Sequence, residues 1–235
     1  GRYFLDKLPD YDEKTAMTAL RCHIPWHLYV INKLWEQLLL AGGGQRQLWR
    51  QLRVKLRRLR SVLALVKPLF PKAADWQRTL KAQATALSGV REYDVLLQTC
   101  ARLRSAQDRE AKAAWVLQQQ DAEPVAQSTM LPVAAVPNLQ RLLEGLRQQA
   151  QVRALQQLKL NQLTYELTQL YMAVYSWAGA PCCLSLREFF VQRLGKWARK
   201  LQELPQLQPD VQDMEQLHRM RIRLKRFRYA LQSVP

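Results

Sequence analysis

The sequence predicts an all-α protein of two antiparallel helical bundles, and three observations support this fold class. Glycine is scarce, with 8 copies in 235 residues. Leucine, glutamine, alanine, arginine and lysine, which all favour helices, are abundant. The β-branched residues rarely alternate with polar ones in the manner of a strand. A hydrophobic fraction of 48% is ordinary for a globular protein, so the helices carry enough apolar surface to pack together.

The first bundle is predicted over residues 15–120. Residues 1–14 hold four acidic residues and a proline, which is typical of a leader or inter-domain linker. Helical patterns then cover roughly 15–41, 45–67, 72–87 and 91–120. The segments "AGGG" at 41–44 and "KPLFPK" at 67–72 separate the first three helices, because glycine weakens a helix and proline cannot continue its interior.

The second bundle is predicted over residues 139–235, after a Pro-rich connector at 121–138. The connector holds three prolines and no charge after Glu123. Helical patterns resume at about 138–178, 185–204 and 210–233, separated by "GAPCC" and "PQLQPD". Asp210 or Asp213 can cap the last helix. The two bundles are expected to form one domain.

An internal repeat relates the two predicted bundles. Placing Arg50 on His218 gives an offset of 218 − 50 = 168 residues. At that offset the cations coincide pairwise: Arg53 with Arg221, Lys55 with Arg223, Arg57 with Lys225, Arg58 with Arg226 and Arg60 with Arg228. The repeat predicts a pseudo-twofold arrangement. Because the chain ends seven residues after Arg228 while helices follow Arg60, we expect the second bundle to be truncated and the chain to be a fragment.

Each repeat contains one helix with a cationic stripe opposite an apolar stripe. At about 100° per residue, the first helix presents Arg46, Arg50, Arg53, Arg57 and Arg60 on one face. Its other face carries Leu48, Leu52, Leu56, Leu59, Leu63 and Val66. The second helix presents His218, Arg221, Lys225 and Arg228 opposite Met220, Leu224, Phe227 and Leu231. We expect each helix to bury its apolar stripe.

The cationic stripes are not balanced by acids on the same helices. There is no acidic residue from Gln45 to Phe70 or from Gln216 to Pro235, and the chain has a net charge of +17. Like charges three or four positions apart each cost about 0.2–0.5 kcal/mol. A single basic face is usually just solvated, but two matched ones favour a binding surface. Either acids of other helices neutralise them or a polyanion does: nucleic acid, an anionic membrane or a phosphate polymer.

Three motifs resemble the CHAD domain family, the conserved histidine α-helical domain. "LHRMRIRLKRFRYAL" resembles its signature helix, and "RQLRVKLRRLRSVLALVKPLF" resembles the first-repeat counterpart. "LSGVREYDVLL" resembles the family's Leu-Gly-x-x-Arg-Asp-x-Asp-Val segment, with Glu92 where the family usually has aspartate. The resemblance covers most of the chain from about residue 16 onward. Arg50 replaces the first-repeat histidine, which keeps a cation but loses a titratable ring.

The resemblance implies binding of inorganic polyphosphate and association with polyphosphate granules. The residues carried over are Arg53, Arg57, Arg58, Arg60, His218, Arg221, Lys225, Arg226 and Arg228, to which we add Arg50. Second-rank candidates are Arg46 and the cations at i, i+3 and i+7 of the preceding helix, Arg193, Lys196 and Lys200. Arg91 can instead pair locally with Glu92 or Asp94. Such domains are often fused to CYTH-type triphosphatases, so an accessory role beside a fused or partner triphosphatase is one alternative, and binding of nucleic-acid backbones is another.

The remaining signals favour a binding module and not an enzyme. His23 and His27 lie at i, i+4 beside Cys22, but a zinc site needs three or four ligands, so we expect packed histidines, no metal and no cofactor. No Gly-rich phosphate loop and no Glu-x-Glu-x-Lys pattern of CYTH enzymes occurs. The four irregularly spaced cysteines favour a reducing, cytoplasmic location. No apolar run is long enough for membrane insertion.

Overall fold

The computed structural model describes residues 15–118, 135–177, 184–202 and 214–232, and these segments are helical. Eight α-helices occur within them: α2 (Ala16–Leu40), α3 (Arg46–Val66), α4 (Ala73–Ala86), α5 (Ser88–Gln118), α6 (Ala135–Leu160), α7 (Leu163–Ser176), α8 (Leu186–Gln202) and α9 (Met214–Leu231). The strand-like pairing within these segments is limited to an isolated antiparallel bridge between Thr15 and Ser185. The prediction of an all-α fold is confirmed.

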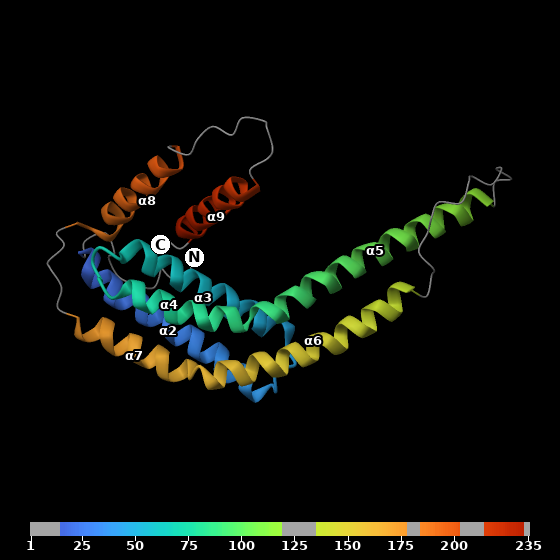
Figure 1. Cartoon of the computed structure of the whole chain (residues 1–235), viewed down its shortest axis with the longest axis horizontal. Helices are drawn as coiled ribbons and strands as arrows, with labels where there is room; N and C mark the ends of the chain where they lie inside the picture. The colour runs from blue at the N-terminus through green and yellow to red at the C-terminus, as the bar shows by residue number, and fades with distance from the viewer. Residues whose placement is uncertain (1–14, 119–134, 178–183, 203–213, 233–235) are drawn as a thin grey trace.

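Helices α2 and α3 form the central hairpin of the molecule (Figure 1). The "AGGG" segment makes the turn, with φ of 58° at Gly42 and 82° at Gly43, which glycine adopts at little cost. A Cβ at Gly43 would lie 2.9 Å from Leu155 Cδ1. Trp49 Nε1 donates a 2.7 Å hydrogen bond to the Gly43 carbonyl and ties the turn to α3.

The main core is built from both halves of the chain. All six residues of the apolar stripe predicted on α3, from Leu48 to Val66, are buried as expected. Helix α7 adds Leu163, Leu167, Leu170 and Val174 to the same cluster, and α8 adds Leu186, Phe189 and Phe190. Helix α4 packs on α3, while α7 and α8 pack on α2. The segment before residue 121 therefore shares one core with the segment after residue 138.

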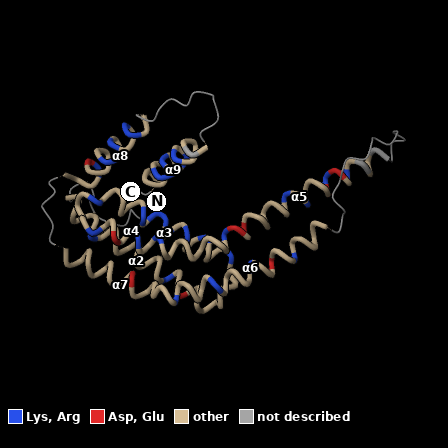
Figure 2. Tube along the Cα trace, viewed as in Figure 1, with Lys and Arg blue, Asp and Glu red and all other residues tan. Residues whose placement is uncertain are grey.

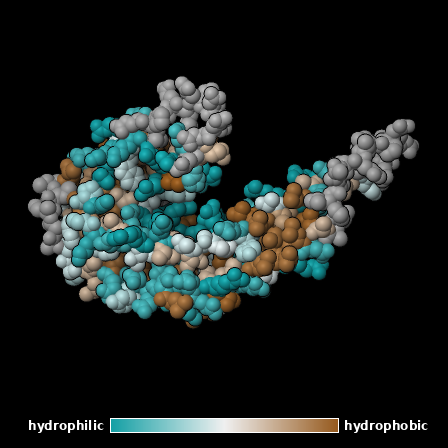
Figure 3. Space-filling model, viewed as in Figure 1, coloured by the Kyte–Doolittle hydropathy of each residue, from teal (hydrophilic) through white to brown (hydrophobic). Residues whose placement is uncertain are grey.

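Helices α5 and α6 extend away from this core as a long arm (Figure 1). The arm has a small core of its own, formed by Leu97, Cys100, Val136 and Leu143, with Tyr93 packed against it. Figure 3 shows apolar side chains along the visible face of the arm. At its base the Arg147 side chain, only 4% exposed, donates from Nε to Asp94 Oδ1 at 2.5 Å. This ion pair links α6 to α5.

The prediction of one helix over 138–178 is wrong, because α6 ends at Leu160 and α7 begins at Leu163. Gln162 adopts a left-handed conformation with φ of 50°, and the Asn161 carbonyl accepts a 2.9 Å hydrogen bond from Gln83 Nε2. Neither glycine nor proline marks this break, so tertiary contacts with α4 stabilise it. Residues 135–138 of the predicted connector belong to α6. The rest of the connector and the predicted leader, residues 1–14, lie outside the described residues.

The expected burial of the apolar stripe on α9 is also wrong. Leu224 and Leu231 are 48% and 49% exposed, whereas Ala230 is fully buried. Ala230 lies about 100° or more around the helix from those leucines. Helix α9 meets α3 on one side and α8 on the other, so it buries the flank of Ala230 and leaves the leucine stripe toward solvent.

Candidate functional site

The cationic stripe of α3 runs between α5 and α9. Arg50 is exposed, but Arg53, Arg57 and Arg60 are half-buried, and burial lowers the pKa of each of these three guanidinium groups. Neighbouring cations lower the pKa further: Arg91 of α5 acts on Arg53, and Arg226 of α9 acts on Arg60. Among the described residues, no carboxylate forms an ion pair with these α3 arginines. The repulsion predicted from the sequence therefore persists around Arg57 and Arg60, while Asp94 lies near enough to Arg53 to raise its pKa and Glu144 pairs with Arg46.

The stripes of α3 and α9 meet at Tyr229. The Arg57 Cζ atom lies 4.0 Å from the centroid of the Tyr229 ring, and the Arg228 Cζ atom lies 5.0 Å from it. Burial favours the neutral phenol, but a 3.4 Å hydrogen bond from Arg228 and the charges of Arg57, Arg228 and Lys225 give the Tyr229 side chain a lowered pKa. Cation–π attraction thus offsets part of the crowding of like charges.

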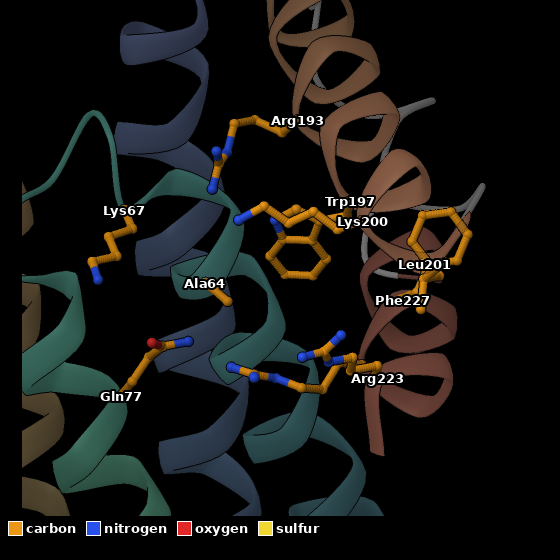
Figure 4. Close-up of a pocket in the computed structure, with 10 residues that line it drawn as sticks. Ala64, Lys67, Gln77, Arg193, Trp197, Lys200, Leu201, Arg223 and Phe227 are labelled. Carbon is orange, nitrogen blue, oxygen red and sulfur yellow. The ribbon is translucent and has the colours of Figure 1, made fainter. Parts of the chain in front are cut away.

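A first pocket, which we call the α8–α9 pocket, opens between α3, α8 and α9 (Figure 4). Its volume is about 640 Å³. Five cations line it: Lys67, Arg193, Lys200, Arg223 and Arg226. The remaining lining residues are Ala64, Gln77, Trp197, Leu201 and Phe227, so none of the described residues that line the pocket is acidic. Arg193 is oriented by a 2.8 Å hydrogen bond from its Nε to the Leu65 carbonyl at the end of α3.

A second pocket, the α3–α5 pocket, lies at the other end of the α3 stripe and also measures about 640 Å³. Four cations line it, Arg46, Arg50, Arg53 and Arg91, together with Asp94. Asp94 accepts from Arg147, which does not line the pocket, whereas Glu144 pairs at 3.6 Å with Arg46, one of the pocket's own cations. Arg91 does not form the local ion pair with Glu92 or Asp94 that the sequence left open; its charge lies beside Arg53 and Arg57.

Eight of the predicted cations line neither pocket. Arg57, Arg60 and Arg228 lie along the contact between α3 and α9, and the other five lie elsewhere on α3, α8 and α9. Arg58 lies on another flank of α3, where its charge and that of Lys55 lower the pKa of His27 in α2. Lys196 is exposed on α8, and His218 is exposed on the first half of α9. Arg221 and Lys225 line a shallow, largely apolar depression with Leu217, Met220, Leu224 and Arg228. The fold therefore brings together part of the predicted set and separates the rest.

Several residues that the sequence did not single out complete the site. Lys67 and Arg223 line the α8–α9 pocket, and Tyr229 lies between two arginines. Arg223 matches Lys55 in the repeat, but on the helical wheel both lie off the cationic stripe, so the spacing did not single out Arg223. Trp197 of α8 also lines the α8–α9 pocket. Figure 2 shows Lys and Arg recurring on α3, α8 and α9 where these helices approach one another.

The two histidines of α2 pack in the core, as the sequence predicts. Their Nε2 atoms are 3.1 Å apart. Burial lowers the pKa of His23 to about 4, and burial together with the charges of His23, Lys55 and Arg58 lowers the pKa of His27 to about 3. Both rings are neutral near pH 7. Within the described segments, no cluster of three or more histidine, cysteine, aspartate or glutamate side chains is arranged to hold a metal ion.

Comparisons with known proteins agree with this fold. The CHAD domain family model matches residues 31–235. A solved structure, PptA from Streptomyces chartreusis, superposes with a TM-score of 0.58 at 18% sequence identity, and the alignment covers 94% of this chain and 76% of PptA. No curated protein sequence matches the chain. None of the helices in the described segments is both long and apolar enough to cross a membrane.

Proposed function

Since the chain belongs to the CHAD domain family, we propose that it is a non-catalytic module that binds inorganic polyphosphate, the ligand that membership of this family implies. The proposed binding surface, which we call the cationic track, follows α3 and collects cations from three further helices. Its members are Arg50, Arg53, Arg57, Arg60, Lys67, Arg91, Arg193, Lys200, Arg223, Lys225, Arg226 and Arg228. Arg46, Arg58, Lys196, His218 and Arg221 lie at its edges, where we expect them to attract the ligand without direct contact.

One observation carries the proposal: arginines of different helices lie near one another, and no carboxylate of the described residues forms an ion pair with Arg57, Arg60, Arg226 or Arg228. Arg57 lies near Arg91 of α5 and Arg228 of α9, and Arg60 lies near Arg226. Such an arrangement is unfavourable in the empty protein, because burial and mutual repulsion both disfavour the charged guanidinium. A bound polyanion relieves both costs. Arginine also makes bidentate hydrogen bonds to phosphate oxygens, whereas lysine acts as a point charge. The predominance of arginine therefore favours a ligand with phosphate groups.

The dimensions of the track suit a chain of phosphates. From Arg46 to Lys67, α3 rises by about 32 Å at 1.5 Å per residue. Cations recur along it every three or four residues, and pockets with further cations lie at both ends. Inorganic polyphosphate is flexible and carries charge on every unit, so it can bend past Tyr229 from one pocket to the other. We propose the same interaction as the basis for recruitment to polyphosphate granules.

Competition between polyanions tests the proposal. Labelled polyphosphate is bound to the protein at about physiological salt, where non-specific binding to DNA is weak, with Kd near 10⁻⁴–10⁻⁶ M. Unlabelled polyphosphate, single-stranded DNA and double-stranded DNA then compete at equal phosphate concentration. We expect polyphosphate to displace the label at a much lower concentration than either DNA. DNA that competes equally well or better would show a nucleic-acid-binding protein instead.

A further inference from the structure

The α8–α9 pocket contains an aromatic side chain, Trp197, for which inorganic polyphosphate has no matching apolar group. Trp197 is half-buried, with part of its ring packed against the main core. Figure 4 shows the side chain projecting from α8 toward the middle of the pocket, among the cationic side chains. Phe227 and Leu201 add further apolar surface to the same pocket. A ligand made only of phosphates gains little binding energy from contact with these apolar side chains.

The indole of Trp197 is free of stacked cations, in contrast to the tyrosine of the neighbouring α3–α9 contact. Arg57 and Arg228 both lie over the Tyr229 ring. Arg193 and Lys200 lie four residues before and three residues after Trp197 on the same helix, a spacing at which side chains are neighbours. Tryptophan is the ring that attracts cations most strongly, yet among the described residues none stacks on Trp197. Within the described segments the half-buried ring is therefore not covered by a stacked cation, and the part of it that lines the pocket can contact a flat ligand group.

The α3–α5 pocket provides an internal comparison. It has the same volume and a similar set of cations, but its tryptophan is not available. Trp49 is only 3% exposed, and its Nε1 donates to the Gly43 carbonyl. The α8–α9 pocket is thus the one of these two that combines cations with an open aromatic ring.

We propose that the α8–α9 pocket binds a nucleoside polyphosphate, with the base stacked on Trp197 and the phosphates held by the surrounding cations. A volume of about 640 Å³ lies in the usual range of small-molecule sites. Arg193, Arg223 and Arg226 supply hydrogen bonds to phosphate oxygens, while Lys67 and Lys200 supply charge. The inference rests on the proposed function, because these cations also belong to the cationic track. It adds a ligand class that competes with polyphosphate for one end of the track.

The test compares ATP with inorganic tripolyphosphate, which has the same number of phosphates and no base. Calorimetry on the unaltered chain is expected to give tighter binding of ATP than of tripolyphosphate, although ATP carries less charge. Trp197→Leu is expected to weaken ATP binding about tenfold, the usual effect of losing one stacked base, and to leave tripolyphosphate binding unchanged. Trp197→Phe keeps a ring and is expected to retain most of the preference. Trp115→Leu, at an exposed tryptophan of the arm, is the matched control.

Long-chain polyphosphate is titrated in parallel to separate the two proposals. Polyphosphate binding without any preference for ATP over tripolyphosphate overturns the nucleotide site and leaves the proposed function intact. ATP binding that depends on Trp197, without binding of long-chain polyphosphate, overturns the proposed function instead. The comparison of ATP with tripolyphosphate uses the unaltered chain, so the inference is decided even if Trp197→Leu fails to fold.

Discussion

The half-buried arginines of α3 differ in what surrounds them. Arg57 is stacked on Tyr229 and lies near the charges of Arg91 and Arg228, whereas its sequence neighbour Arg58 approaches His27 on the α2 flank. Arginine stays protonated even when burial lowers its pKa, so Arg57 offers a fixed charge to a ligand. Position on the helix, and not the count of cations, therefore decides which arginines can contact a phosphate chain.

Arg57→Gln and Arg58→Gln test this difference between adjacent residues. We expect Arg57→Gln to weaken polyphosphate binding about tenfold, since a hydrogen bond to a charged group contributes about 1.5–3 kcal/mol. Arg57→Gln should also make binding less sensitive to salt, because one phosphate contact is lost. Arg58→Gln should have a clearly smaller effect on both quantities. Equal losses for the two variants, at unchanged helicity, would mean that the cationic track is wrongly placed on α3.

The buried histidine pair of α2 predicts sensitivity to acid. The lowered pKa values, about 4 for His23 and about 3 for His27, mean that the unfolded chain binds protons before the folded chain does. The contribution of each neutral histidine to the free energy of unfolding is therefore fully present above about pH 6.5. It falls by up to about 1.4 kcal/mol per pH unit as the pH drops toward about 4 for His23 and about 3 for His27. Denaturant unfolding of His27→Leu at several pH values should give a shallower slope. An unchanged slope would assign the acid sensitivity to other groups.

At the scale of helices, the sequence predicted α3 better than α9. The apolar stripe of α3 is buried as the spacing indicated, because α2 and α4 pack on that side. The same pattern in α9 was misleading, since Leu224 and Leu231 stay exposed and the flank of Ala230 is buried. Periodicity gives the amphipathic faces of a helix, but it does not tell which neighbours are there to cover them. The break between α6 and α7 was missed for a similar reason, because a contact between Gln83 and Asn161 stabilises it.

The pair of Arg147 and Asp94, which joins α6 to α5 within the arm, also influences the α3–α5 pocket. Asp94 lines that pocket and lies near enough to Arg53 to affect its pKa. Arg147 holds the Asp94 carboxylate from the α6 side and neutralises it. Without Arg147, we expect the carboxylate to pair with the cations of the pocket and to repel phosphate.

Arg147→Leu is therefore expected to lower both stability and polyphosphate affinity. Breaking a buried ion pair costs about 3–5 kcal/mol, and the partial exposure of Asp94 should reduce this value. The double variant Arg147→Leu, Asp94→Leu removes the unpaired charge and should recover much of the affinity. Denaturant unfolding and polyphosphate titration are measured on all three proteins. If the double variant binds as weakly as Arg147→Leu, the loss of affinity comes from a displaced arm and not from the freed carboxylate.

At the scale of the whole molecule, the all-α class and about half of the candidate site could be read from the sequence. Two pockets are lined by residues that the sequence suggested as ligand contacts, and their role in binding stays a prediction: Arg46, Arg50, Arg53, Arg193, Lys200 and Arg226. Lys67, Arg223, Trp197 and Tyr229 become part of the site only because α3, α8 and α9 converge, which no local pattern reports. The core joins residues from both sides of the predicted connector. The pseudo-twofold repeat that first linked the two stripes stays a prediction.

A crystal structure with bound polyphosphate tests the central claim most directly. We predict density for a chain of phosphates that runs from the α3–α5 pocket along α3, past Arg57 and Tyr229, into the α8–α9 pocket. Guanidinium groups of α3 and α9 should contact the same chain from two sides. Phosphates bound only on the outer face of α9, near His218 and Arg221 and away from α3, would contradict the cationic track.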